Sequence, residues 1–372
     1  MADYLSLINY MNIDFANLQL QYKKYKKDID ASIKAVLNKS NYIMGEEVQD
    51  LERNLEEFTG AKHAITCSSG TDALLLAIMA LDIQLGDEII TTPFTFIATV
   101  EMVALIKAKP VFVDIETDTF NIDATKIEAA ITGKTKAIIV VSLYGQPADI
   151  EPIQIIANKY NIKVIIDGAQ SFGATYNGKT DSNLGDISIT SFFPAKPLGC
   201  YGDGGAVFTN NDEYAEKIKM MRVHGQNKRY HHKYVGIGGR LDTIQAAILL
   251  AKLPHYDQEL VDRQRISQTY TNALSSILPT PIVKEGRSST WAQYTIRVKN
   301  QNKFKNSNMP TVVHYPMPLH LQECFRYLRY SGGSFPIAEY ASLEVISLPI
   351  NPFLSNKEVD YIIQSVKLSI DD

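Results

Sequence analysis

The sequence predicts an α/β fold in which a mostly parallel central sheet is flanked by helices. From about residue 60 to residue 210, short apolar runs rich in β-branched residues alternate with amphipathic segments of helical period. Runs of this kind are typical of strands that are covered by helices on both faces of a parallel sheet. At 372 residues, of which 45% are hydrophobic, the chain is also long enough for a second, smaller domain.

Seven segments are expected to form strands. They are "HAITC" (63–67), "DEIITT" (87–92), "PVFVDI" (110–115), "KAIIVVSLYG" (136–145), "KVIIDGA" (163–169), "DISITSFF" (186–193) and "GAVFTN" (205–210). Segments between them, such as "TDALLLAIMALD" and "ATVEMVALIKA", have the period of a helix. Strands and helices in this alternation indicate βα units around a parallel sheet.

The pattern changes after residue 210. Residues 212–225, 241–253 and 255–278 predict helices, and the last of these is long enough to bridge two domains. A strand "WAQYTIRV" (291–298), a loop "VVHYPMPLH" (312–320) and a terminal helix from about Asn356 are expected to follow. We therefore divide the chain into a large domain with an N-terminal arm, residues 1–254, and a small C-terminal α+β domain, residues 255–372.

Composition narrows the class of partner. The chain has 41 acidic and 37 basic side chains and a net charge of −4, which argues against general binding to nucleic acid or to an acidic membrane. It has no basic leader before a long apolar run and no apolar stretch of membrane-spanning length. Its three widely spaced cysteines suit a reducing compartment. We expect a cytoplasmic protein with neither a nucleic-acid nor a membrane partner.

The first candidate motif for chemistry is "CSSGTDALLLA", in which a strand is followed by a short polar turn and a helix. Ligands of parallel α/β sheets bind at the carboxyl ends of the strands, and a helix N-terminus offers free N–H groups to an anion. The same residues also suit simple capping of the helix by Ser69 or Thr71. The motif alone leaves both interpretations open.

The second and third motifs are "VIIDGAQSFGA" and "SFFPAKPLGCYGDGGA". Asp167 closes an apolar strand, where a desolvated carboxylate needs a cationic partner, although it could equally cap a helix. Ser191 ends a later strand, and Lys196 lies in the glycine-rich turn beyond it. The lysine by itself is weak evidence for a function.

Together the three motifs suit pyridoxal 5′-phosphate (PLP). This cofactor requires an amine for its aldehyde, an anion facing its ring nitrogen and donors for its phosphate. Asp167 would keep the ring protonated, and Lys196 would form the resting Schiff base with a neutral amine and later carry a proton. The sequence therefore predicts PLP as the cofactor.

With these motifs the sequence resembles the DegT/DnrJ/EryC1/StrS sugar aminotransferases, which have the aspartate aminotransferase fold (fold type I). The resemblance runs from "SNYIMGEEVQDLERNLEEFTGAKHAI" through "GTDAL", "TPFTFIAT", "DGAQSFGA" and "SFFPAKPLGCYGDGGA" to "RLDTIQAAIL" and "VHYP". It implies that Lys196 bears the cofactor and that Asp167 faces the pyridine nitrogen. It also implies a homodimer with active sites at the subunit interface.

The resemblance assigns further residues to the cofactor. Gln170 would contact the ring hydroxyl or stack on the ring, and Phe96 would stack on it, unless Phe96 is simply a buried residue at a strand end. Thr71, the backbone of Asp72, and Ser191 would hold the phosphate. The sequence departs from the family at Gly238, where relatives often have an asparagine that reaches the neighbouring subunit's phosphate.

Substrate recognition is expected from two regions. The segment "HGQNKRYHHK" includes Arg229 and Tyr230 among several cations, which suits a nucleotide diphosphate, although it could be a solvated loop. Arg240, His314 and Tyr315 are the further candidates, and Arg240 could bind a sugar carboxylate bidentately or pair with a nearby acid such as Asp242. No cysteine or carboxylate cluster accompanies the histidines, so no metal is expected.

The resemblance is strongest to the branch that aminates C3 of nucleotide-linked 3-keto sugars. We expect transfer of an amino group, from L-glutamate to give 2-oxoglutarate, to a UDP-2-acetamido-3-oxo-uronate, for surface polysaccharide, lipopolysaccharide or other glycan biosynthesis. The alternatives are a dTDP-3-keto-6-deoxyhexose or a 4-keto nucleotide sugar. A sugar dehydratase of this family would carry histidine in place of Lys196, and a regulator would need an added DNA-binding domain.

Overall fold

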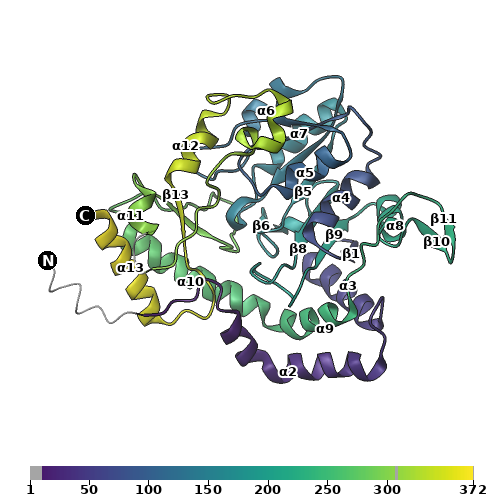
Figure 1. Cartoon of the computed structure of the whole chain (residues 1–372), viewed down its shortest axis with the longest axis horizontal. Coiled ribbons are helices and arrows are strands. Elements are labelled where there is room, and N and C mark those ends of the chain that lie inside the picture. The colour runs from purple at the N-terminus through teal and green to yellow at the C-terminus, as the bar shows by residue number, and fades with distance from the viewer. Residues whose placement is uncertain (1–10, 306–308, 372) are drawn as a thin grey trace.

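The computed structural model describes residues 11–305 and 309–371, and its central feature is a seven-stranded sheet (Figure 1). The strands lie in the order β1-β9-β8-β5-β4-β2-β3. Their bounds are β1 His63–Cys67, β2 Glu88–Thr91, β3 Lys109–Phe112, β4 Thr135–Val141, β5 Lys163–Asp167, β8 Ile187–Ser191 and β9 Gly205–Thr209. Each strand overlaps one predicted segment, which confirms the α/β class.

The directions of the strands determine where their carboxyl ends lie. β9 is antiparallel to both of its neighbours, β1 and β8, while β8, β5, β4, β2 and β3 are parallel to one another in turn. Because β1 and β8 both oppose β9, they point the same way. The carboxyl ends of all strands other than β9 therefore meet at one edge of the sheet, where ligands of α/β folds bind.

Both faces of the sheet are apolar. Along β4, Ile139 faces a core shared with α4 (Gly70–Ala80), α5 (Ala98–Leu105) and α8 (Asp212–Met221), whereas Ile138 and Val140 face a core shared with α6 (Ala124–Ala130) and α7 (Ile150–Tyr160). Successive side chains of a strand point to opposite faces, so continuous apolar strands are buried between two helix layers, as the sequence indicated.

A second core lies beside the sheet. It is formed by α10 (Tyr256–Leu274), β12 (Tyr294–Arg297), β13 (Val345–Leu348) and α13 (Asn356–Asp371), and Ile13 of the N-terminal segment packs into it. β12 and β13 are antiparallel. In Figure 1, α10 runs from beside α13 toward α9. The division at residue 254 stays a prediction, and the first ten residues of the expected arm lie outside the described residues.

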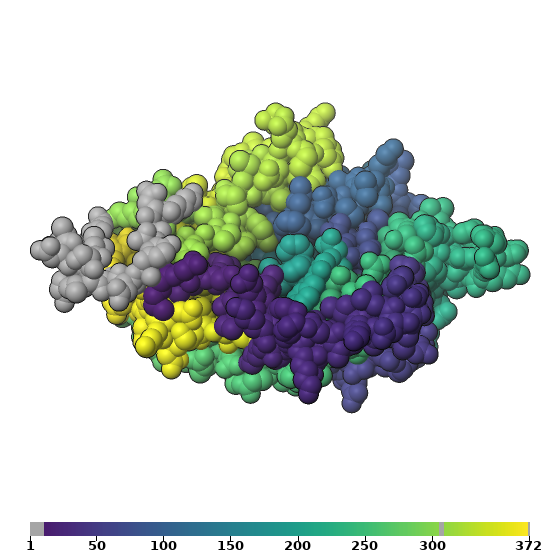
Figure 2. All heavy atoms as spheres, turned by 60° about the horizontal axis from the view of Figure 1, so that its bottom comes forward, coloured from purple at the N-terminus to yellow at the C-terminus, as the bar shows by residue number. Residues whose placement is uncertain are grey.

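The N-terminal arm continues as α2 (Leu18–Lys39), which packs against α9 (Thr243–Lys252) on the face that is forward in Figure 2. The remaining elements are α3 (Glu46–Thr59), α11 (Gln301–Lys305), α12 (Pro336–Glu344), the 3₁₀ helices 143–145, 181–183, 253–255, 319–321 and 323–328, and the short hairpins β6–β7 (Thr175–Tyr176, Lys179–Thr180) and β10–β11 (Gln226–Lys228, His231–His232). Among the described residues, no helix is both long and apolar enough to cross a membrane.

Candidate active site

Asp167 is the last residue of β5, and its carboxylate is buried at the carboxyl edge of the sheet. It accepts hydrogen bonds from the Thr99 hydroxyl (2.7 Å) and from the Ala169 amide (3.2 Å). Burial raises the pKa of Asp167, while these donors and the nearby charge of Lys196 oppose the increase. The position therefore provides a desolvated acidic group whose electrostatic counterpart is Lys196.

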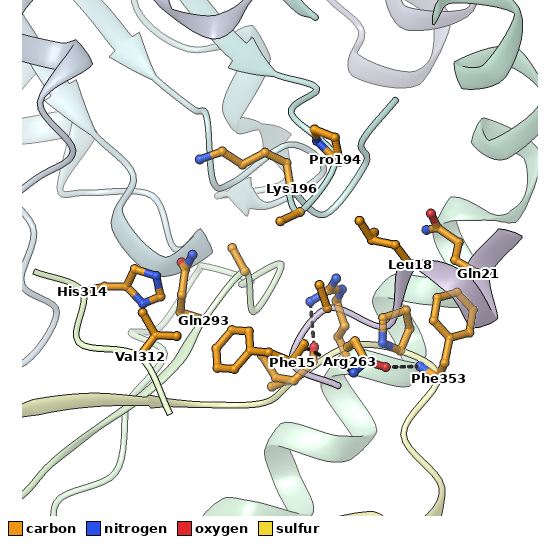
Figure 3. A pocket seen from close by; sticks show the side chains of 16 residues that line it. Phe15, Leu18, Gln21, Pro194, Lys196, Arg263, Gln293, Val312, His314 and Phe353 are labelled. Atoms are coloured by element: carbon orange, nitrogen blue, oxygen red, sulfur yellow. Dashed lines mark hydrogen bonds between the residues drawn. The ribbon is translucent and has the colours of Figure 1, made fainter. Parts of the chain in front are cut away.

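Lys196 lies in the turn that follows β8, where its amide donates to the Phe193 carbonyl (2.9 Å). The side chain is only partly exposed and extends along a cavity of about 170 Å³ (Figure 3). Burial lowers the pKa of Lys196, and Asp167 opposes that change. A lowered pKa increases the fraction of neutral amine, which is the form that attacks an aldehyde.

The N-terminus of α4 lies against the end of β8. Cys67 and Ser191 both pair with Gly205 across the sheet, so the turn after β1 lies close to Ser191. A Cβ added to Gly205 would lie 2.5 Å from the Ser69 backbone, and a Cβ added to Gly70 would lie 2.6 Å from the Ser191 Cβ. Glycine at both positions is what lets the first turn of α4 approach Ser191.

This first turn offers an anion-binding site. The Ser69 side chain caps α4 by accepting from the Asp72 amide (3.0 Å), so the Asp72 N–H, expected at the phosphate, already has a partner. The first intrahelical bond runs from the Ala73 amide to the Ser69 carbonyl (3.0 Å). The amides of Gly70 and Thr71 therefore have no partner within the helix, and they join the Ser191 hydroxyl as donors for an anion.

Gln170 is held from both sides. Its Oε1 accepts from the Tyr144 amide (2.6 Å), and its Nε2 donates to the Tyr315 hydroxyl (3.1 Å). The Tyr144 hydroxyl donates to the His314 carbonyl, and His314 Nδ1 lies 2.9 Å from the Ser347 hydroxyl. These bonds join the loop 312–320 to the end of β4, and they bring His314 and Tyr315 beside Gln170.

The ring of His314 is neutral at ordinary pH. Burial lowers its pKa to about 4, and the charge of Lys196 acts in the same direction. Lys196 and His314 both line the cavity in Figure 3. A neutral imidazole can donate or accept a hydrogen bond there without adding charge.

Phe96 lies at the rim of this region with 53% of its surface exposed. Its ring centroid is 6.5 Å from that of Tyr315, and the ring of Phe94 makes an edge contact with Tyr315 at 6.1 Å. Phe94, not Phe96, is the buried phenylalanine after β2. The exposed face of Phe96 is thus available to a planar ligand.

In the single chain, the residues expected to bind the substrate do not all lie in one site. Arg240 lies near Gly238 and the ring of His224, and the Gly239 carbonyl before it accepts from the Ser68 amide (3.0 Å). This places Arg240 near the start of α4, and no described contact joins it to His314. Arg240 makes no ion pair with Asp242 or with any other carboxylate in residues 11–305 and 309–371.

Arg229 and Tyr230 lie farther away, at the tip of the β10–β11 hairpin. The hairpin projects beyond α8 at one end of the molecule (Figures 1 and 2). Tyr230 is 77% exposed, and the Arg229 guanidinium lies over its ring at 5.1 Å. Within one chain these two side chains do not reach the cavity that Lys196 lines.

Two residues of the site were missed in the sequence. Thr99 holds Asp167, and Tyr144 holds Gln170 and His314. Tyr144 lies shortly after the carboxyl end of β4, so the strand-end rule applied to that strand would have found it. Thr99 lies within α5, and no local pattern sets it apart from other helix residues. In the described part of the chain, no group of three or more His, Cys, Asp or Glu side chains is arranged to hold a metal ion.

The residues fit the three reactive parts of PLP. The buried Asp167 suits a protonated ring nitrogen, the Lys196 amine suits an aldehyde, and the first turn of α4 with Ser191 suits a phosphate. Glycine at positions 70 and 205 lets the first turn of α4 lie directly against Ser191, which brings these phosphate donors together. Fold and site together define a PLP-dependent aminotransferase of the aspartate aminotransferase fold.

Comparison with known proteins agrees with this class. The chain belongs to the DegT/DnrJ/EryC1/StrS aminotransferase family, whose family model matches residues 23–367. It is 48% identical to the UDP-2-acetamido-2-deoxy-3-oxo-D-glucuronate aminotransferase of Pseudomonas aeruginosa, over 94% of this chain and 98% of that one. It is 42% identical to the dTDP-3-amino-3,6-dideoxy-alpha-D-galactopyranose transaminase of Aneurinibacillus thermoaerophilus, over 95% and 98%.

Solved structures extend the agreement to the fold and the cofactor. A DegT DnrJ EryC1 StrS aminotransferase from Brucella abortus has a TM-score of 0.94 and 38% identity, covering 97% of this chain and 100% of that one. NtdA from Bacillus subtilis, with the cofactor PMP (the amino form of PLP) bound, has a TM-score of 0.91 and 29% identity. The match covers 98% of this chain and 87% of that one. The expectations of PLP and of a type I aminotransferase fold are therefore confirmed.

Proposed function

We propose that the enzyme transfers an amino group from L-glutamate to the C3 keto group of a UDP-2-acetamido-3-oxo-uronate. The observation that carries this proposal is Arg240, a partly exposed guanidinium without a carboxylate partner in the described chain, next to the turn that precedes α4. A guanidinium of this kind can bind a sugar carboxylate bidentately. The 48% identity to a 3-oxo-glucuronate aminotransferase supports the same substrate class.

The chemistry is assigned to a small set of side chains. When bound, PLP supplies an aldehyde for the amino group and a ring that accepts electrons. The Asp167 carboxylate holds a proton on the ring nitrogen, with Thr99 fixing its orientation. The Lys196 amine, once free, would accept a proton from the α-carbon of the donor and would later donate a proton to C3 of the sugar. Gln170 would contact the ring hydroxyl, and Phe96 would stack on the ring.

The phosphate is assigned to the amides of Gly70 and Thr71 and to the Ser191 hydroxyl. The Asp72 amide, which Ser69 already caps, keeps a structural role in this proposal. Gly238 offers no side chain to a neighbouring phosphate. The amide donors at the start of α4 and the helix dipole supply the interaction instead.

We further propose that the active enzyme is a homodimer. Arg229 and Tyr230 lie at the tip of the β10–β11 hairpin and do not line their own chain's cavity, so they could serve a nucleotide diphosphate only in a partner's site. Large apolar side chains are exposed in the single chain on α2 and directly after it: Leu20, Leu37, Tyr42 and Ile43. Burial of such side chains favours association.

We also expect the protein to be cytoplasmic, because the three cysteines of the chain are free thiols.

A dTDP-3-keto-6-deoxyhexose is the second candidate substrate. The observation in its favour is the 42% identity to a transaminase that forms a dTDP-3-amino-3,6-dideoxy sugar. Such a sugar has no carboxylate, so Arg240 would then have no anionic group of the sugar to bind. The two candidates differ in the one group that Arg240 is proposed to recognise.

The test is to combine purified enzyme and L-glutamate with a panel of 3-keto and 4-keto nucleotide sugars and to identify the products by mass spectrometry. Arg240→Ala should lower kcat/KM for the 3-keto uronate by roughly 30-fold or more, because losing one partner of a desolvated charge pair costs about 2–5 kcal/mol. The neutral 6-deoxy sugar should be little affected. Equal losses on both substrates, or a wild-type preference for the neutral sugar, would contradict the uronate assignment.

A further inference from the structure

Three buried arginine side chains in the described chain have an Nε atom without a hydrogen-bond partner: Arg222, Arg263 and Arg287. Two of them are neutralised, since Arg222 pairs with Glu52 and Arg287 pairs with Asp149 (2.5 Å). Arg263, which is 7% exposed, makes no ion pair with any described carboxylate. A buried guanidinium that lacks a paired anion is costly to maintain.

The hydrogen bonds of Arg263 leave one edge of its guanidinium unused. Nη1 donates to the Trp291 carbonyl (3.1 Å) and to the Ile350 carbonyl (2.7 Å). Nε has no partner, and no hydrogen bond joins Nη2 to any residue that the structure describes. The Nε–Nη2 edge is one of the two edges through which arginine grips a carboxylate with two parallel bonds.

Burial accounts for the electrostatic state of this group. Burial lowers the pKa of the Arg263 guanidinium, and the electrostatic interactions with Tyr256 and Glu259 oppose this decrease. Glu259 is itself buried one turn earlier in α10, and its Oε1 lies 3.5 Å from the Gln21 Nε2 that donates to it. Arginine nevertheless stays protonated in proteins, so Arg263 keeps a positive charge.

This charge faces the same cavity as Lys196. Figure 3 shows Lys196 above Arg263, with Gln293 beside His314 on one side and Gln21 beside Leu18 on the opposite side. Among residues 11–305 and 309–371, no aspartate or glutamate lines the cavity. A cationic guanidinium at a cavity wall with no carboxylate partner in the described chain favours a ligand that brings a negative charge to it.

We propose that Arg263 binds a carboxylate of the amino donor, a dicarboxylic amino acid such as L-glutamate, through its Nε–Nη2 edge. The proposal rests on the aminotransfer proposed above and deepens it by locating the donor. The donor must place its α-carbon next to Lys196, and its second carboxylate can then extend along the cavity toward Arg263. Arg240, near the start of α4, is left for the sugar.

The probe is glutarate, which has both carboxylates of the donor but no amino group to react. Its dissociation constant is measured by calorimetry on the holoenzyme, for the wild type, for Arg263→Lys and for Arg287→Lys. Lysine keeps the charge but lacks the planar edge. The Arg287 variant is the matched control, because Arg287 is another buried arginine with a free Nε but lies outside the cavity lining.

Arg263→Lys should weaken glutarate binding at least about tenfold and raise KM for L-glutamate by a similar factor. The dissociation constant of the nucleotide sugar should stay within about twofold, and Arg287→Lys should change none of these values. Unchanged glutarate binding in Arg263→Lys would overturn the proposal. Equal weakening of the sugar would also overturn it, because Arg263 would then serve the sugar or the shape of the cavity.

A second measurement covers the case in which Arg263→Lys does not fold. A crystal structure of the wild-type holoenzyme soaked with glutarate should have a carboxylate on the Nε–Nη2 edge of Arg263, and glutarate bound elsewhere would refute the assignment. Both readouts are independent of the sugar. If the wild type aminates no nucleotide keto sugar, the proposed function fails while the glutarate results still judge Arg263.

Discussion

Replacement of Asp181 by asparagine tests the electrostatics beneath the active site. The Asp181 carboxyl is 1% exposed and accepts from the Ser142 hydroxyl (3.0 Å) and from the Ser171 hydroxyl. The carboxyl also lies next to Gly168, the residue that follows Asp167, since a Cβ added to Gly168 would lie 2.9 Å from the Asp181 Oδ2. Burial raises the pKa of Asp181 from 3.8 to about 7, the two serine hydroxyls oppose the increase, and Asp167 adds to it.

The sign of the pH dependence follows from these values. Below pH 3.8 the carboxyl is protonated in both the folded and the unfolded chain, so it does not make stability vary with pH. Between pH 3.8 and about pH 7 the folded chain keeps the proton on Asp181 that the unfolded chain releases. Stability therefore falls as pH rises through this window, by up to about 4 kcal/mol at 1.36 kcal/mol for each pH unit.

Asparagine keeps the shape but does not titrate, so Asp181→Asn should remove this loss. Urea unfolding at pH 5 and at pH 8 measures the free energies of unfolding. The variant should gain stability relative to the wild type between these two pH values, on the order of 3 kcal/mol. Asp30→Asn is the control, because that exposed carboxyl has a lowered pKa, pairs with Lys26 and is ionised throughout the window. A wild-type-to-variant gap that is the same at both pH values would refute the reasoning.

Four further predictions concern the site. Lys196→Ala should abolish turnover and the borohydride-reducible link to the cofactor, and wild-type turnover in this variant would disprove its role. Asp167→Asn should bind cofactor but transaminate far more slowly, because a neutral amide cannot keep the ring nitrogen protonated; full activity would contradict this. Tyr144→Phe should leave the His314 carbonyl without its donor at a cost of about 1–3 kcal/mol, raising KM for the substrates while cofactor binding, measured by titration, persists. Sedimentation should show a homodimer, and a fully active monomer would exclude it.

Local sequence patterns were sufficient to predict the sheet and to place Asp167, Ser191 and Lys196 at one edge of it. The strands were visible because a strand buried on both faces must be a continuous apolar run. Asp167, Ser191 and Lys196 were visible because polar side chains directly after such runs lie at the carboxyl edge of a parallel sheet. Both signals depend on residues that are close together in the chain.

Only the tertiary structure decided which distant residues share the site. Tyr144, Gln170 and Tyr315 are separated by up to about 170 residues, yet one chain of hydrogen bonds joins them. Arg263 belongs to an amphipathic helix whose pattern does not distinguish a buried, unpaired guanidinium from a solvated one. Arg240 and Arg229 are both cations in polar segments, and only the fold separates the one near α4 from the one on a projecting hairpin. The physical reason is that periodicity reports which face of an element is buried, whereas partners across the core are set by how the elements pack.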